Sequence, residues 1–279
     1  FSLRRSIPLA SGALLVLSLA LVTACSSSGR LSVPPGTSQP DKFLFDKGNE
    51  ALQKKKWITA REFFKQVTET YTQSPLRPDA KLAVGDTYLG EGTTEAYILA
   101  IAEFQEFLSY YPTHPRADYA QYQLGLAHFR QMRAPQRDQT ETRDTIREFE
   151  AFVVRYPKSA LLPEAKNRLR EAHDRLSASE FEVGQFYYHI HWYPGAIDRL
   201  STLLKNDPDY TQRDGAYFYL AESYYKANRM KEALPYYERL LDEFKQSQFM
   251  AQTKKRVAEL KSGTAGQPAA AATAPKTQQ

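Results

Sequence analysis

The sequence predicts an all-α fold, an α-solenoid of about five helix–turn–helix repeats with about ten helices. Two observations lead to this prediction. A triplet of one small and two large residues recurs five times along the chain. A glycine or alanine recurs ahead of each triplet. Prolines and charged stretches separate the copies, as expected between short helices.

The triplets mark the second helix of each repeat. A small residue is followed four and seven positions later by larger residues, which places all three side chains on one helical face. The five triplets are Ala60, Phe64, Val67; Ala100, Phe104, Phe107; Thr145, Phe149, Phe152; Ala196, Leu200, Leu203; and Ala233, Tyr237, Leu240. Proline follows three of them, at 112, 157 and 208, and cannot continue a helix.

The small residues ahead of the triplets mark the first helix of each repeat. They are Gly48, Gly85, Gly125, Gly184 and Ala221. Two antiparallel helices approach closely where a small residue of one faces a large residue of the other. Together the two halves match the tetratricopeptide repeat (TPR), so we expect a TPR superhelix.

Two departures from the regular spacing are informative. The third repeat is eight residues longer than the standard, and its stretch "RQMRAPQRDQTETRD" is predicted to be an exposed, charged loop. Between the third and fourth repeats, apolar residues keep a helical phase through "LLPEAKNRLREAHDRLSAS" and on to Val183. This phase predicts one unusually long helix.

The amino-terminal residues resemble a lipoprotein export signal. Arg4 and Arg5 precede an apolar run that is short for a membrane-spanning helix and ends in small residues. The sequence "VTAC" at 22–25 resembles a bacterial lipobox, in which cleavage before the cysteine allows its acylation. Ser26, rather than Asp, then favours the outer membrane. The alternatives are an uncleaved amino-terminal anchor and a core cysteine that follows a chance apolar run.

These features predict five segments along the chain. A signal peptide occupies 1–24, and lipidated Cys25 begins a Ser- and Pro-rich tether over 25–41. Repeats 1–3 occupy 42–160, and the long bridging helix with repeats 4 and 5 occupies 161–250. An end helix and a disordered tail are expected over 251–279.

Composition and motifs argue against catalysis and against nucleic-acid binding. The formal net charge of +5 is only mildly basic, and two of its positive charges, Arg4 and Arg5, belong to the predicted signal peptide. No long run of Lys and Arg is present that would indicate nucleic-acid binding. Since Cys25 is the only cysteine, an internal disulfide is excluded. No catalytic, phosphate-binding or metal-binding motif is found, so no catalytic residue, cofactor or metal is expected. His189 and His191 are expected to point apart on one helix, which disfavours a metal site there.

A TPR array presents a concave groove lined by its first helices. Counting along the predicted first helices places Phe45, Asn49, Tyr119 and Tyr122 on or near this surface. Such aromatic residues suit an extended peptide that carries aromatic side chains. The alternative is that these rings pack between neighbouring repeats.

The chain resembles the BamD family of lipoproteins of the outer-membrane β-barrel assembly (Bam) machinery. The resemblance covers roughly residues 41–250. It is carried by the lipobox cysteine, the tether and five TPR units, and by the stretches "YYPTHPRADYAQYQLGLAHF", "FEAFVVRYPKS" and "FEVGQFYYHIHWYPGAIDRLSTLLKNDP".

This resemblance implies an adaptor at the periplasmic face of the outer membrane, held there by its lipid. The amino-terminal repeats would bind carboxy-terminal targeting segments of unfolded β-barrel proteins, and Tyr71 matches a family tyrosine near that end. The carboxy-terminal repeats would dock on a POTRA domain of BamA, where Arg199 matches a family arginine. Other Bam lipoproteins are implied partners. A different periplasmic TPR scaffold, acting in cell-wall synthesis or the Tol-Pal system, is the alternative function.

Overall fold

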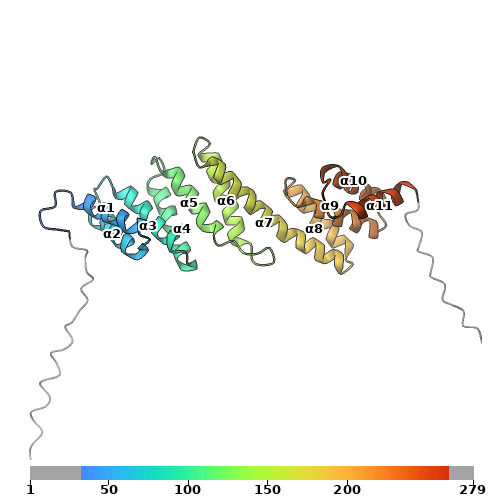
Figure 1. Cartoon of the computed structure of the whole chain (residues 1–279), viewed down its shortest axis with the longest axis horizontal. Helices are drawn as coiled ribbons and strands as arrows, with labels where there is room; N and C mark the ends of the chain where they lie inside the picture. Colours follow the sequence, from blue (N-terminus) through green and yellow to red (C-terminus); the bar gives the residue numbers. More distant parts are fainter. Residues whose placement is uncertain (1–32, 264–279) are drawn as a thin grey trace, which may run out of the picture.

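The structure, a computed structural model, describes residues 33–263, and its regular elements there are all helices (Figure 1). The predicted signal peptide, Cys25 and most of the tether and tail lie outside the described residues. The eleven helices in this range are α1 (Pro40–Gln53), α2 (Trp57–Thr70), α3 (Arg77–Glu91), α4 (Thr94–Tyr110), α5 (Ala117–Phe129), α6 (Thr140–Arg155), α7 (Leu162–His189), α8 (Tyr193–Asn206), α9 (Arg213–Lys226), α10 (Met230–Glu243) and α11 (Met250–Lys261).

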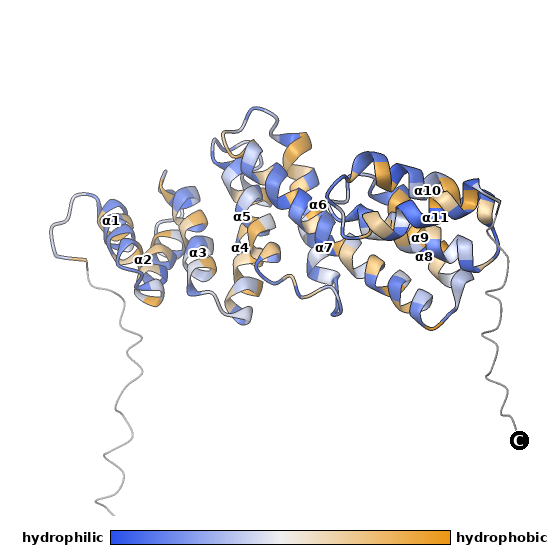
Figure 2. Cartoon of the chain, turned by 45° about the vertical axis from the view of Figure 1, so that its right-hand side comes forward, coloured by the Kyte–Doolittle hydropathy of each residue, from blue (hydrophilic) through white to orange (hydrophobic). Residues whose placement is uncertain are grey.

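The helices form an elongated row in which each one packs against the next (Figure 1). The pairs α1–α2, α3–α4, α5–α6, α7–α8 and α9–α10 are the five predicted repeats, and α11 packs on α10 at the end of the row. Hydrophobic and hydrophilic residues alternate as bands along the helices (Figure 2). The predicted all-α TPR superhelix is confirmed.

The repeat pattern places small residues against large ones, as predicted. Every residue of the five triplets is buried. A Cβ added to Gly48 would lie 2.5 Å from a ring carbon of Phe64. A Cβ on Gly184 would lie 2.6 Å from the side chain of Leu200. The glycines therefore allow the two helices of a repeat to approach closely.

The predicted long helix is α7, which has 28 residues. In Figure 1 it runs diagonally between the amino-terminal and carboxy-terminal groups of helices. Its middle is tied to the end of α8 by Asp207, a buried carboxylate. Arg170 of α7 donates to both oxygens of Asp207, at 2.9 and 2.5 Å, and the Ser177 hydroxyl donates at 2.6 Å. The long helix is therefore held to the fourth repeat by a bidentate ion pair.

The loop predicted over "RQMRAPQRDQTETRD" is only partly correct. Residues 130–139 are mostly exposed, but the last five residues of the stretch begin α6. The buried Gln139 side chain donates to the carbonyls of Ala134 and Arg137, at 2.8 and 3.0 Å, and accepts from the Thr142 hydroxyl at 2.8 Å. These bonds close the insert into an ordered turn and explain why the helix begins early.

The expectation that His189 and His191 lie on one helix is wrong. Helix α7 ends at His189, and His191 has φ +63° in the left-handed region. The amide of His191 donates to the Tyr188 carbonyl at 3.0 Å, and that of Trp192 to the Tyr187 carbonyl at 2.9 Å. This pair of bonds is a Schellman motif, which ends a helix with a left-handed residue. A residue with positive φ also follows the first helix of repeats 1 and 5, where it is Lys55 and Asn228.

Candidate protein-binding surfaces

The first helices line the inner side of the array. Helix α3 contacts α5, α5 contacts α7, and α7 contacts α9, whereas neighbouring second helices approach each other less closely. The array therefore curves with its first helices on the concave side, as TPR arrays do. The predicted peptide groove belongs to this face.

A hydrogen-bonded cluster joins α3 and α5. The Tyr119 hydroxyl donates to Asp86 Oδ1 at 2.9 Å. Gln123 donates to the Tyr119 hydroxyl oxygen at 2.7 Å and to Asp86 Oδ1 at 3.3 Å. Burial raises the pKa of Asp86 to about 6, although its bonds to Tyr119 and Gln123 act in the opposite direction. The guanidinium of Arg116 stacks over Tyr119, 4.7 Å from the ring centre. Tyr119 is thus held rigidly with polar groups around it.

The predicted residues of the first repeat lie at the amino-terminal end of the array. Phe45 and Asn49 are half-buried and lie one turn apart on α1. The Phe45 ring packs edge-on against Phe64, with centres 5.5 Å apart. Tyr71 follows α2 and packs on the core formed by α1 to α5. Phe45 and Tyr71 thus both contribute to packing, while Asn49 is a half-buried amide on the same face as Phe45.

Tyr122 lies within the third repeat. Its ring packs edge-on against Phe149 and Phe152 of α6, with centres 5.7 and 6.1 Å apart. Tyr119 and Tyr122 share a face of α5, but α3 lies between this helix and α1. The structure therefore places the predicted groove residues in two groups, one on α1 and one on α5, rather than in one pocket.

A polar cavity lies between α2, α3 and α4. This cavity of about 240 Å³ is lined by Lys65, Arg77, Lys81, Glu103, Glu106 and Tyr110, among others. The Lys81 ammonium lies 2.6 Å from Glu103 and 2.7 Å from Glu106. The lining carries three basic side chains, Lys65, Arg77 and Lys81, and three acidic ones, Glu69, Glu103 and Glu106, so its formal charges cancel. Its residues come from three helices, and no local sequence pattern connects them.

Arg199 lies on the exposed face of α8. Its side chain is 47 % exposed, and its guanidinium Nη1 lies 3.2 Å from the Glu180 carboxylate of α7. An exposed ion pair of this kind contributes little to stability. The Arg199 guanidinium therefore remains accessible at the surface despite its pair with Glu180.

The turn between α7 and α8 exposes three large hydrophobic side chains. Phe186, Ile190 and Trp192 are 57, 53 and 52 % exposed. Phe186 and Ile190 lie one turn apart at the end of α7, and Trp192 precedes α8. Sequence reasoning assigned this stretch to repeat architecture and did not identify its exposed side chains.

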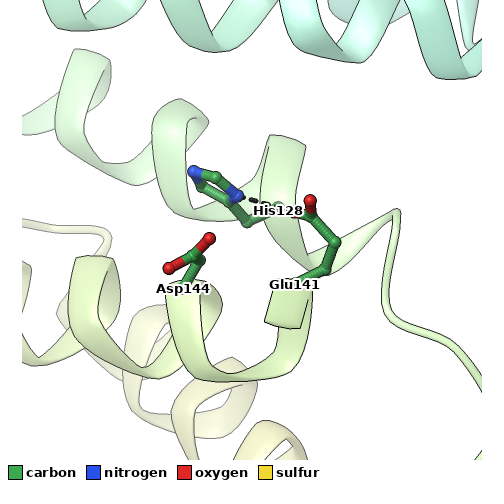
Figure 3. A group of neighbouring side chains, drawn as sticks. All are labelled: His128, Glu141 and Asp144. Carbon is green, nitrogen blue, oxygen red and sulfur yellow. Dashed lines mark hydrogen bonds and ion pairs between the residues drawn. The ribbon is translucent and has the colours of Figure 1, made fainter. Parts of the chain in front are cut away.

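One group of side chains within residues 33–263 has the composition of a metal site. It consists of His128, Glu141 and Asp144 (Figure 3). No metal ligand was expected from the sequence. His128 is buried, in the position where other repeats carry Tyr88, Tyr187 or Tyr224.

None of the helices between residues 33 and 263 combines the length and the apolar character needed to cross a membrane.

The amino-acid sequence matches the family model YfiO, described as "Outer membrane lipoprotein", over residues 37–234. Similar curated proteins include the outer membrane protein assembly factor BamD of Caulobacter vibrioides, 26 % identical over 219 residues, covering 78 % of this chain and 70 % of the relative. BamD of Vibrio cholerae is 26 % identical over 206 residues, covering 70 % of this chain and 82 % of the relative.

Solved structures that resemble the chain include the TPR2AB domain of yeast Sti1 in its complex with a pHSP90. The two are 13 % identical, with a TM-score of 0.43 and coverage of 80 % of this chain and 84 % of that one.

Proposed function

The chain belongs to the YfiO family of outer membrane lipoproteins, and from this membership we infer a non-catalytic adaptor of β-barrel assembly. In this proposal, the chain binds carboxy-terminal targeting segments of unfolded outer-membrane proteins and docks on a POTRA domain of BamA. Its other partners are the remaining Bam lipoproteins, and Cys25 carries the lipid that holds it at the outer membrane.

The extent of the family match is the observation that carries the proposal. It runs from the start of the first repeat into α10 and therefore spans both halves of the array. Curated relatives named as outer membrane protein assembly factors align over 70–78 % of this chain. The helical array supports a binding role, because a TPR superhelix offers extended surfaces for other proteins.

Client binding is assigned to the amino-terminal half. Asn49 on α1 and Tyr119 on α5 lie on its first helices, and an amide and a phenol can hydrogen-bond the backbone of an extended peptide. The rings of Phe45 and Tyr122 support this face from beneath, since both pack on large residues of the second helices. Tyr71 belongs to the same end of the molecule.

Binding of a peptide that ends in an aromatic residue tests the client assignment. Replacement of the half-buried Asn49 by alanine is expected to weaken the binding of this peptide to the purified chain, because one polar contact is lost. Asn167→Ala on the exposed face of α7 is the matched control and should leave the affinity unchanged. Equal affinities for wild type and Asn49→Ala would remove Asn49 from the client site.

Docking on BamA is assigned to the carboxy-terminal half. A carboxylate on the POTRA domain would replace Glu180 and pair with Arg199 in bidentate geometry. Arg199→Glu should weaken binding of a purified POTRA domain strongly, since it sets like charges against each other. Arg239→Glu reverses an exposed arginine that is also paired on its own surface, at 3.0 Å from Glu243, and is the control. Equal weakening in both variants would show that overall charge, rather than Arg199, is responsible.

Acylation of Cys25 supplies the membrane attachment in this proposal. Cys25→Ala should lose fatty-acid labelling, because the variant lacks the thiol that is acylated. It should also leave the membrane fraction, because a stable anchor needs two or more acyl chains. Retention of the variant in the membrane fraction would contradict a lipid anchor at this residue.

A further inference from the structure

We propose that His128 and Asp144, with Glu141 orienting the imidazole, bind a divalent transition-metal ion such as Zn²⁺. His128 lies near the end of α5, and the two carboxylates lie in the first turns of α6 (Figure 3). One potential ligand atom from each of the three residues lies within 4.8 Å of the other two. The site therefore spans the two helices of the third repeat, beside the insert.

The residue types suit this class of ion. Zn²⁺ binds imidazole nitrogen and carboxylate oxygen at about 2.0–2.2 Å. The imidazole favours transition metals over Mg²⁺ and Ca²⁺, which take oxygen ligands. Two carboxylates balance the double charge of the ion. Water would complete the coordination, because the side chains of Glu141 and Asp144 are partly open to solvent.

The imidazole itself provides a second, independent observation. His128 is only 6 % exposed. Its Nδ1 lies 2.8 Å from Glu141 Oε2, whereas its buried Nε2 has no hydrogen-bond partner among the residues that the structure describes. Buried polar atoms are nearly always paired, so an unpaired ring nitrogen calls for a ligand.

The arrangement of the ring matches that of metal-bound histidines. A metal-binding histidine usually donates its second ring N–H to a carboxylate, which fixes the ring and makes the free nitrogen more basic. Here Glu141 holds Nδ1 and leaves Nε2 for the ion. In Figure 3 the Asp144 carboxylate faces the imidazole from a different side than Glu141 does.

Asp144 can reach the ion without leaving a charge unpaired. It pairs with Arg147 in the structure, with 2.5 Å between Oδ1 and Nη1. Arg147 also pairs with Glu148 at 2.9 Å, and its side chain is largely exposed. Arg147 therefore keeps a carboxylate partner when Asp144 turns toward the metal.

The insert holds the carboxylates in place. Gln139, two residues before Glu141, closes the turn through its bonds to Ala134 and Arg137. The Thr145 hydroxyl donates to the Glu141 carbonyl at 2.7 Å. A bound ion would join α5 to α6 across residues 130–139 and stabilise the third repeat by mass action.

Calorimetric titration of the metal-free full-length lipoprotein in detergent with Zn²⁺ tests the site. Saturable binding of one ion with micromolar affinity is expected, together with a rise in the melting temperature. His128→Asn should abolish binding, because the asparagine amide replaces Nδ1 and keeps a donor for Glu141 but removes Nε2. Asp144→Asn, at a partly exposed position, should also abolish it. Glu141→Gln should weaken it about 10–100-fold.

His189→Asn is the matched control, since His189 is exposed at the end of α7 and belongs to no such group among residues 33–263. Cys25 is present in every variant, so a loss of binding reports on the histidine site. Bound Co²⁺ should give a visible absorption band that requires His128. Absence of saturable binding to wild type, or unchanged binding in folded His128→Asn and Asp144→Asn, would overturn the proposal.

Discussion

The Ser159 hydroxyl donates a 2.6 Å hydrogen bond to the carboxylate of Asp118, which lies 41 residues earlier in the chain. The equivalent bonds, Ser74 to Asp41 and Ser247 to Asp214, span 33 residues. In each case the serine follows a second helix and the aspartate lies in the first turn of the preceding first helix. The longer span of the third repeat accommodates its eight-residue insert, so the insert loops out without changing how the repeat closes.

Replacement of Ser159 by alanine should lower the free energy of unfolding by about 1–2 kcal/mol, because a hydrogen bond to a carboxylate is lost in a partly buried place. Ser74→Ala and Ser247→Ala should have similar effects, since they remove the same bond. Urea denaturation followed by circular dichroism measures the difference. Ser201→Ala is the control, because that hydroxyl donates to a carbonyl of its own helix. A loss no larger than in the control would mean that the serine bond does not hold the repeat closed.

The cluster around Asp86 should make stability depend on pH. Burial raises the pKa of Asp86 from 3.8 to about 6, so the folded chain binds a proton that the unfolded chain has released between these values. The stability from this group is thus largest below pH 3.8 and falls as the pH rises to about 6. In Asp86→Asn this decline should be absent, because the amide keeps an oxygen acceptor for Tyr119 and carries no charge.

Unfolding curves collected across this pH range for wild type and Asp86→Asn measure the effect. Asp242→Asn, at an exposed aspartate, should follow the wild-type curve. Parallel curves for wild type and Asp86→Asn would show that Asp86 titrates normally in the folded chain.

The carboxylate of Glu222 is expected to hold the last helices in place. It is 1 % exposed and accepts hydrogen bonds from Arg256 of α11, at 2.7 and 3.3 Å, and from the Tyr237 hydroxyl of α10 at 2.5 Å. The hydrogen bonds from Arg256 to Glu222 raise the pKa of the Arg256 guanidinium. Glu222→Ala should cost about 3–5 kcal/mol, because it leaves a largely buried charge without its main partner.

Hydrogen exchange should show this loss first in α10 and α11, since Glu222 joins both helices to α9. Glu238→Ala is the control, because it removes an exposed pair with Lys261 in the same region. Unchanged protection of α11 in Glu222→Ala would contradict this role.

Sequence reasoning predicts the helices well because the repeat pattern is local. A small residue and the large residues four and seven positions later lie on one helical face whatever the rest of the chain does. Gly48 and Phe64, or Gly184 and Leu200, meet because the second helix folds back directly on the first. The long helix α7 is predictable for the same reason, since its apolar phase is unbroken from Ala165 to Val183.

Contacts that depend on how one helix is placed against another could not be predicted in this way. Asp86 and Tyr119 are 33 residues apart, and their meeting depends on how far each repeat is rotated against the next. The pairing of His128 with Glu141 depends on the path of the insert. His191 could not be placed because the sequence near it is compatible with a longer helix, and only the Schellman hydrogen bonds show where α7 ends.

Affinity purification of the tagged full-length lipoprotein from native envelopes, with quantification of the proteins that accompany it, is the most direct test of its function. An adaptor of β-barrel assembly should recover a POTRA-bearing BamA in amounts close to its own, and much less of it in Arg199→Glu than in Arg239→Glu. Recovery of cell-wall synthases or Tol-Pal proteins without BamA would contradict this account.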